Sequence, residues 1–120
     1  MTTKTNLPEI KPYPSKDGSL IRELMHPNQH SVQQQSLAEA IVPAGATTAL
    51  HRHRESEEIY HILSGSGHMS LGDDAFNVGP GDSVCIPPGT AHCLRNTGTQ
   101  ELRLLCCCAP AYSHNDTEIL

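Results

Sequence analysis

Short runs of alternating polar and apolar residues follow one another along most of the chain, and turns rich in glycine and proline separate them. From residue 45 onward, no run reaches the roughly ten residues of uninterrupted helical periodicity that a helix needs. The runs of strand length are TTALHRH (47–53), EEIYHIL (57–63), HMSL (68–71), AFNV (75–78), SVCI (83–86), AHCLR (91–95) and ELRLLCCC (101–108). Strands of this length and spacing favour an all-β sandwich or barrel.

The pattern is less regular before residue 45. Residues 1–18 combine three prolines with polar residues, which predicts an extended N-terminal arm. Residues 19–24 alternate in polarity and predict a strand, and residues 25–35 are polar and predict a loop. Residues 36–42 suit a strand that ends at Pro43, although their Leu, Ala and Glu residues suit a helix as well. We therefore expect an arm over 1–18 and one domain over 19–120.

Composition and charge narrow the class of protein. A chain of 120 residues fits one domain. The formal net charge of −5 argues against a nucleic-acid partner. No apolar run approaches the roughly 20 residues of a membrane helix, and the N-terminal residues lack the apolar stretch of a signal peptide. We expect a soluble cytoplasmic protein with no membrane partner.

The cysteines indicate reduced thiols. There are five, an odd number, and Cys106, Cys107 and Cys108 are consecutive, whereas a disulfide scaffold would show an even and spaced set. Buried thiols behave as small hydrophobic groups, so we expect these three to pack in a strand. A thiolate metal site is the alternative, but no paired C-x-x-C motif supports it.

Histidines and glutamates form the one constellation with evident chemistry. His51 and His53 are alternate residues of a predicted strand, so both imidazoles can point to one face. Glu57 and Glu58 follow shortly after, and His92 comes just after the turn PPGT. Three imidazoles and a carboxylate suit a divalent first-row ion: Mn, Fe, Co, Ni, Cu or Zn. The alternative is that these are exposed histidines on polar strands.

The spacing of these residues resembles the two motifs of the cupin family. The first motif, G-x5-H-x-H-x(3 or 4)-E-x6-G, is complete from residue 45 to residue 65. The second, G-x5-P-x-G-x2-H-x3-N, is complete from residue 81 to residue 96. Glu58 leaves the six residues that the first motif requires before Gly65, and Glu57 leaves seven. Glu58 is therefore the ligand candidate.

The resemblance implies a double-stranded β-helix of the jelly-roll type, the cupin barrel. It implies that the metal lies inside the barrel, held by His51, His53, Glu58 and His92. It also implies a homodimer, and we expect the arm or the strand at 19–24 to add to the partner's sheet.

Two further residues are candidates for contact with a substrate. If Glu58 points into the barrel, strand alternation points Tyr60 inward too, where its phenol would act as a donor or weak acid or simply pack. Arg22 would bind a substrate carboxylate, or form a surface ion pair.

The leading prediction is a metal-dependent enzyme acting on a small oxygen-rich metabolite, of the dioxygenase or isomerase/lyase type. The alternative is a non-catalytic cupin that binds or senses a small molecule.

Overall fold

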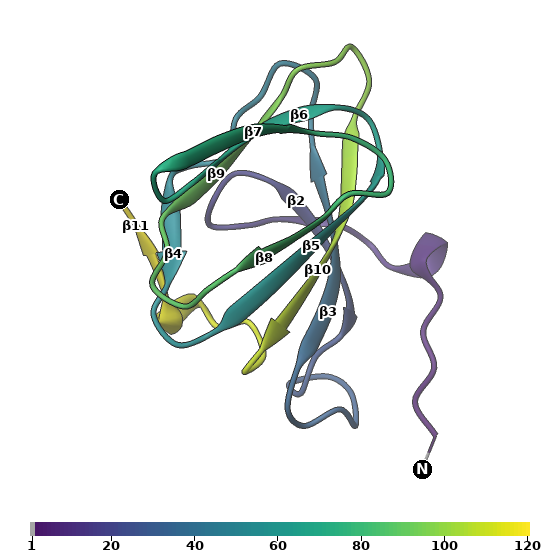
Figure 1. Cartoon of the computed structure of the whole chain (residues 1–120). Helices are drawn as coiled ribbons and strands as arrows, with labels where there is room; N and C mark the ends of the chain where they lie inside the picture. The colour runs from purple at the N-terminus through teal and green to yellow at the C-terminus, as the bar shows by residue number, and fades with distance from the viewer. Residues whose placement is uncertain (1) are drawn as a thin grey trace.

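The computed structural model, which describes residues 2–120, contains two antiparallel β-sheets that face each other and form a barrel (Figure 1). The order of strands in the six-stranded sheet is β1 (Tyr13–Pro14), β2 (Leu20–Met25), β3 (Ser36–Val42), β10 (Leu102–Ala109), β5 (Glu57–Ser64) and β8 (Ser83–Ile86). The order in the five-stranded sheet is β11 (Thr117–Ile119), β4 (His51–His53), β9 (His92–Asn96), β6 (Gly67–Leu71) and β7 (Asp74–Val78). Neighbouring strands are often far apart in sequence, as in a jelly roll.

The predicted all-β jelly roll is confirmed, and the strands lie close to the expected runs. Residues 36–42 form β3, which pairs with β2 on one side and β10 on the other. The helical alternative for this run is wrong because a central position in the sheet overrides the helix propensity of its Leu, Ala and Glu residues. Of the run 47–53, only His51–His53 is a strand.

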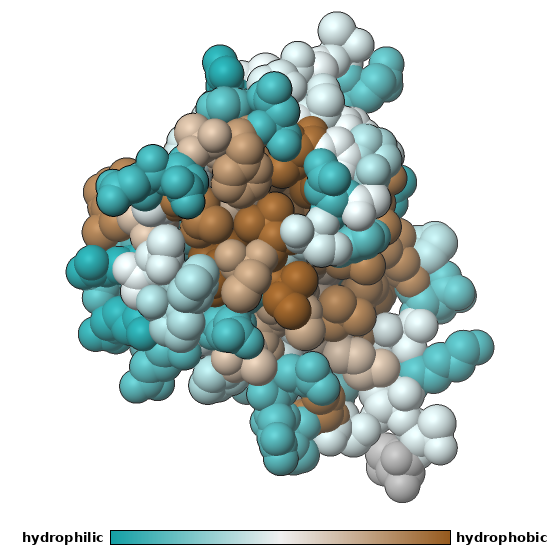
Figure 2. Space-filling model, viewed as in Figure 1, coloured by the Kyte–Doolittle hydropathy of each residue, from teal (hydrophilic) through white to brown (hydrophobic). Residues whose placement is uncertain are grey.

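The core lies between the sheets and follows the two-residue period of the strands. On β5, Tyr60 and Ile62 are buried, whereas Ile59 and Leu63 are 46% and 41% exposed. β10 pairs with β5 so that Leu104 lies opposite Ile62. Each fully buried side chain of this kind contributes roughly 1.5–3 kcal/mol to stability. In the view of Figure 1, apolar side chains gather in the middle of the face and hydrophilic ones surround them (Figure 2).

The ends of the chain are more structured than the sequence suggested. Within the arm expected over 1–18, residue 1 lies outside the described residues, a 3₁₀ turn spans Leu7–Glu9, and β1 pairs with β2. The C-terminal residues form a second 3₁₀ turn (His114–Asp116) and then β11, which pairs with β4 at the edge of the five-stranded sheet. Among the described residues, no helix is long and apolar enough to cross a membrane.

A glycine between β5 and β6 is required by both its backbone conformation and its surroundings. Gly65 has φ of +91°, and a Cβ there would lie 2.8 Å from the carbonyl oxygen of Glu101. Gly45 has φ of +75°, and a Cβ there would have no neighbouring atom within 4 Å. A side chain at position 45 would therefore introduce backbone strain alone, whereas a side chain at position 65 would introduce backbone strain and a steric clash.

We expect Gly45→Ala to lower the free energy of unfolding by about 1–2 kcal/mol through backbone strain alone. Gly65→Ala should cost roughly 1–3 kcal/mol more, because the added methyl group displaces backbone of the neighbouring strand. Urea denaturation of both variants measures the difference, and equal losses would contradict the role of the close contact.

Candidate metal centre

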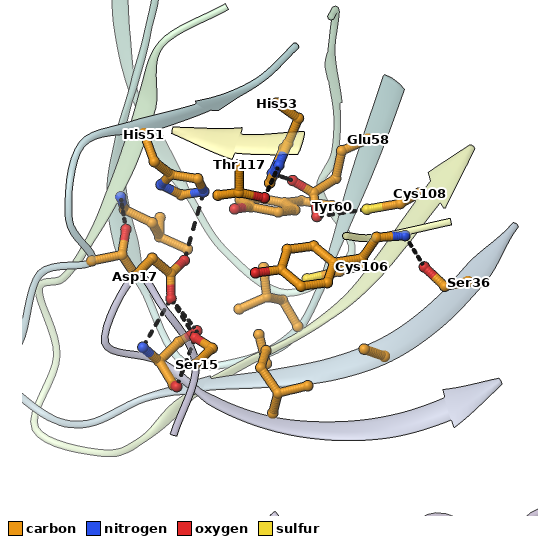
Figure 3. A pocket seen from close by; sticks show the side chains of 18 of the residues that line it. Ser15, Asp17, Ser36, His51, His53, Glu58, Tyr60, Cys106, Cys108 and Thr117 are labelled. Carbon is orange, nitrogen blue, oxygen red and sulfur yellow. Dashed lines mark hydrogen bonds and ion pairs between the residues drawn. The ribbon is translucent and has the colours of Figure 1, made fainter. Parts of the chain in front are cut away.

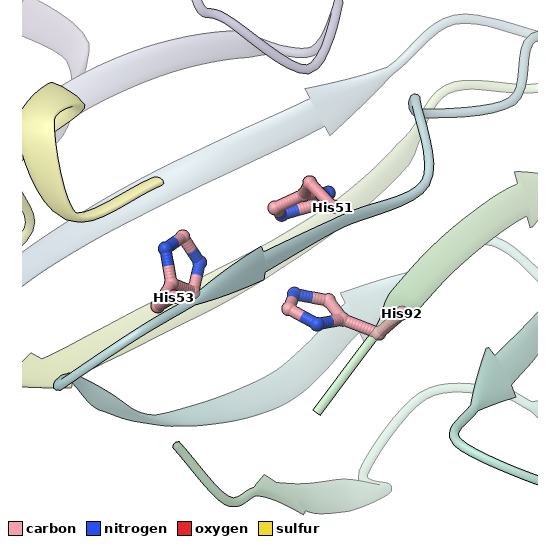
Figure 4. Close-up of side chains that lie close together, drawn as sticks. All are labelled: His51, His53 and His92. Carbon is pink, nitrogen blue, oxygen red and sulfur yellow. The ribbon is translucent and has the colours of Figure 1, made fainter. Parts of the chain in front are cut away.

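Pairing of β4 with β9 brings the three histidines of the motifs together. His51 and His53 share one face of β4, and His92 on β9 lies directly opposite His51. All three side chains are buried, and their candidate ligand atoms lie within 4.8 Å of one another. Figure 4 shows the side chains of His51, His53 and His92 close together. Among the described residues, this is the cluster that meets the spacing of a metal site.

Each imidazole is oriented by a hydrogen bond at Nδ1. The acceptors are the carbonyl oxygen of Ala49 for His51 (2.7 Å), the carbonyl oxygen of Thr90 for His92 (2.9 Å) and Oγ1 of Thr117 for His53 (2.9 Å). The Thr117 hydroxyl donates its own proton to the carbonyl oxygen of Ser113, so it accepts from His53. With the Nδ1 protons used in this way, the Nε2 lone pairs are free to bind a metal.

Glu58 approaches the histidines from the opposite sheet. Its Oε1 lies 3.1 Å from Nε2 of His53 and 3.6 Å from Nε2 of His92. Its Oε2 accepts a hydrogen bond from the Cys108 thiol at 3.2 Å. Burial alone would raise the pKa of Glu58, but the neighbouring His53 and His92 lower it to about 2. The neighbouring Glu57 is exposed.

The donor set fits a bound cation. Nε2 of His92 is buried without a hydrogen-bond partner among the described residues. When Nδ1 of His53 carries the ring's proton, Nε2 of His53 and Oε1 of Glu58 present lone pairs to each other at 3.1 Å, which a shared cation would stabilise. Burial and the neighbouring His92 lower the pKa of His51, which favours the neutral ring that a metal needs.

A cavity of about 60 Å³ opens beside the cluster, which is room for a few water-sized groups. Its apolar wall is formed by Ile21, Ala40, Val42, Leu94 and Leu104. Tyr60 also lines it, and burial, followed by the nearby Glu58, raises the pKa of the phenol well above its usual value. The phenol therefore stays protonated. Figure 3 shows Glu58, His53 and Tyr60 on one side of the cavity and Asp17 on the other.

Arg22 is not brought to this cavity. Its Nη1 lies 2.8 Å from Oε1 of Glu39, a fully buried carboxylate that Arg103 also contacts. The neighbours of Arg22 on β2, Ile21 and Glu23, line the cavity instead. Strand alternation turns Arg22 to the opposite face, where it forms an ion pair, the alternative to a contact with a substrate.

Several residues at the site were not found from the sequence. Asp17, Thr117 and Tyr112 line the cavity, and Cys108 donates to Glu58. None belongs to a cupin motif, and only their positions in the folded chain connect them with the histidines. Cys106 lines the cavity together with Cys108, because alternate residues of β10 share one face.

The chain belongs to the cupin family. The sequence model of the Cupin domain matches residues 38–108, more than half of the chain. Uncharacterized protein MJ1618 of Methanocaldococcus jannaschii is 56% identical over 117 residues, which cover 98% of this chain and 94% of that protein. Protein SchB of Streptomyces halstedii is 29% identical over 106 residues, which cover 84% of this chain and 77% of that protein.

Solved structures share the same fold. A predicted oxalate decarboxylase of Thermotoga maritima superimposes with a TM-score of 0.80 at 23% identity, covering 90% of this chain and 99% of that one. The Streptomyces nucleoside dehydratase Pac13 superimposes with a TM-score of 0.79 at 19% identity, covering 100% and 92%. The protein is a small cupin in which three histidines lie close enough together to hold a metal ion.

We expect Thr117→Val to lower metal affinity by about 10–100-fold, because His53 loses the acceptor that orients its ring. Thr48→Val is the matched control, since Thr48 also lines the cavity but its buried hydroxyl accepts from the amide of Leu94, whereas that of Thr117 accepts from an imidazole. Competition titration with a metal indicator measures both variants. Equal affinity in the two variants would show that Thr117 has no role in orienting His53.

Proposed function

We propose that this protein is a metal-dependent cupin enzyme that acts on a small oxygen-rich metabolite. The observation that carries the proposal is the convergence of three oriented imidazoles and one carboxylate beside a small cavity, with Nε2 of His92 buried and unpartnered among the described residues. In this proposal His51, His53, Glu58 and His92 hold one divalent transition-metal ion. When bound, such an ion supplies Lewis-acid polarisation of a substrate oxygen and, for iron or copper, chemistry with dioxygen.

The other residues of the cavity have separate roles in the proposal. Tyr60 is held in the protonated form and lines the cavity, so its phenol donates a hydrogen bond to a substrate oxygen. The apolar wall excludes water and limits the substrate to a small molecule. Cys108 holds Oε2 of Glu58 and leaves Oε1 directed to the histidines.

The competing hypothesis is a cupin that binds or senses a small molecule without turning it over. Both hypotheses require the cavity, and only the enzyme requires reaction at the metal. Turnover therefore discriminates between them. Substrate-dependent oxygen uptake by the iron-loaded protein would indicate a dioxygenase, and product formation without oxygen uptake would indicate an isomerase or lyase.

We expect the purified protein to hold one divalent metal ion per chain and His92→Ala to lose both the ion and turnover. Circular dichroism should still show a β-sheet fold, because the stability of the barrel comes from its apolar core and not from the metal. Elemental analysis of wild-type and variant protein measures the metal. A wild-type protein that never binds a divalent ion would contradict the proposal.

Tyr60→Phe is the matched variant for the substrate side of the cavity. It should keep the metal content of the wild type and lower turnover, since only the hydroxyl is removed. Unchanged turnover would assign Tyr60 to packing alone.

We also propose that the chain forms a homodimer. β2 is close to the edge of its sheet, and only the two residues of β1 pair with its outer side. Unpaired backbone groups at a sheet edge favour pairing with a second chain. Light scattering at micromolar concentration should give twice the 13.0 kDa of one chain, and a 13.0 kDa species would contradict the dimer.

A further inference from the structure

A short loop before β2 presents one carboxylate to the histidine cluster. Oδ1 of Asp17 accepts three hydrogen bonds, from Oγ of Ser15 (2.6 Å), Oγ of Ser19 (2.7 Å) and the backbone amide of Ser19 (3.0 Å). The backbone amide of Ser15 also donates to the carbonyl oxygen of Ser19 and closes the loop. These bonds restrict the rotation of the Asp17 carboxylate.

The same loop is tied to the two segments that supply the hydrogen-bond acceptors of His51 and His53. The amide of Ala49 donates to the carbonyl oxygen of Asp17 at 2.8 Å, and the carbonyl oxygen of Ala49 accepts from Nδ1 of His51. Nζ of Lys16 donates to the carbonyl oxygen of Thr117 at 2.7 Å, next to the hydroxyl that orients His53. The position of Asp17 is therefore coupled to the position of the histidines.

The second carboxylate oxygen of Asp17 is unused. Oδ2 lies 3.7 Å from Nε2 of His51, which is too long for a hydrogen bond, and it accepts none from the described residues. Figure 3 shows Asp17 and Glu58 on opposite sides of the cavity. An acceptor fixed in this position faces the cavity that His51, His53 and Glu58 also line.

The charge of the cavity determines which ligands it suits. The lining contains Asp17, Glu23 and Glu58 and, among the described residues, no lysine or arginine. A divalent ion bound with Glu58 would keep one positive charge, and the Asp17 carboxylate cancels it. A dianionic ligand would then meet no cationic side chain and two acceptors that lack a donor among the described residues, Oδ2 of Asp17 and the buried Oε1 of Glu23. A ligand with a hydroxyl or N–H group directed at Asp17 would satisfy its Oδ2.

We propose that Asp17 is the specificity-determining residue of the site. Its Oδ2 accepts a hydrogen bond from a hydroxyl or N–H group of the molecule bound at the metal centre, and its charge disfavours dianions. The substrate class is thus a small, donor-bearing molecule that is neutral or cationic in solution. This inference rests on the proposed metal centre.

The test compares two ligands that both chelate a metal through two oxygens. Oxalate is a dianion without donor groups, and acetohydroxamate carries less negative charge and has an N–H group. Isothermal titration calorimetry measures both affinities on Ni²⁺-loaded protein. Asp17→Asn keeps an oxygen for Ser15 and Ser19 and places an amide donor where Oδ2 was. We expect the ratio of acetohydroxamate to oxalate affinity to fall by roughly tenfold or more, the effect of one hydrogen bond to a charged group.

Glu118→Gln is the control for the loss of one negative charge. Glu118 lies on β11, contacts Arg52 and Arg54, and does not line the cavity. In Glu118→Gln the ratio of acetohydroxamate to oxalate affinity should equal that of the wild type. Asp17→Ser also removes the carboxylate and gives an independent measurement if Asp17→Asn does not fold.

The outcomes separate the inference from the proposed function. An unchanged ratio with full nickel content would overturn the role of Asp17 and leave the metal centre intact. Loss of nickel from Asp17→Asn would make Asp17 a ligand and overturn the inference as well. Failure of the wild type to bind nickel or any other divalent ion would overturn the proposed function, and the inference with it.

Discussion

The orientation of three imidazole rings is the constraint on which the site depends. His51, His53 and His92 each use Nδ1 on an acceptor of the protein, and this leaves the three Nε2 atoms in one small volume. Without those acceptors the rings would rotate, and the three Nε2 atoms would no longer converge. Backbone carbonyls supply two of the acceptors, so the segments that lead into β4 and β9 set the orientation of His51 and His92.

The third acceptor connects the site to the end of the chain. Thr117 lies on β11, the last strand, and pairs directly opposite His53. The loop around Asp17 comes from the opposite end and contacts β11 through Lys16. Both segments lie outside the region 38–108 that the family model matches. The barrel therefore carries the ligands, and the terminal segments complete their surroundings.

The same strands form both the apolar core of the barrel and the polar part of the cavity. The apolar faces of β5 and β10 pack in the core, and the same two strands carry Glu58 and Cys108 into the cavity. On the outer face, the buried carboxylate of Glu39 is stabilised by Arg22 and Arg103. A buried carboxylate without such partners would cost several kcal/mol, so Arg22 serves the sheet and not the cavity.

Local pattern was sufficient for the strands and the turns, and the motif spacing selected the four residues that remain the candidate ligands. A two-residue period assigns the faces of a strand, and the glycines expected at turns do have positive φ at positions 45, 65, 81 and 89. The choice of strand over helix for β3, the ion pair of Arg22, and the approach of Asp17 and Thr117 to the histidines depended on the folded chain. Each of these results from contacts between residues distant in sequence. The spacing of residues along the chain does not specify which strands become neighbours in the fold.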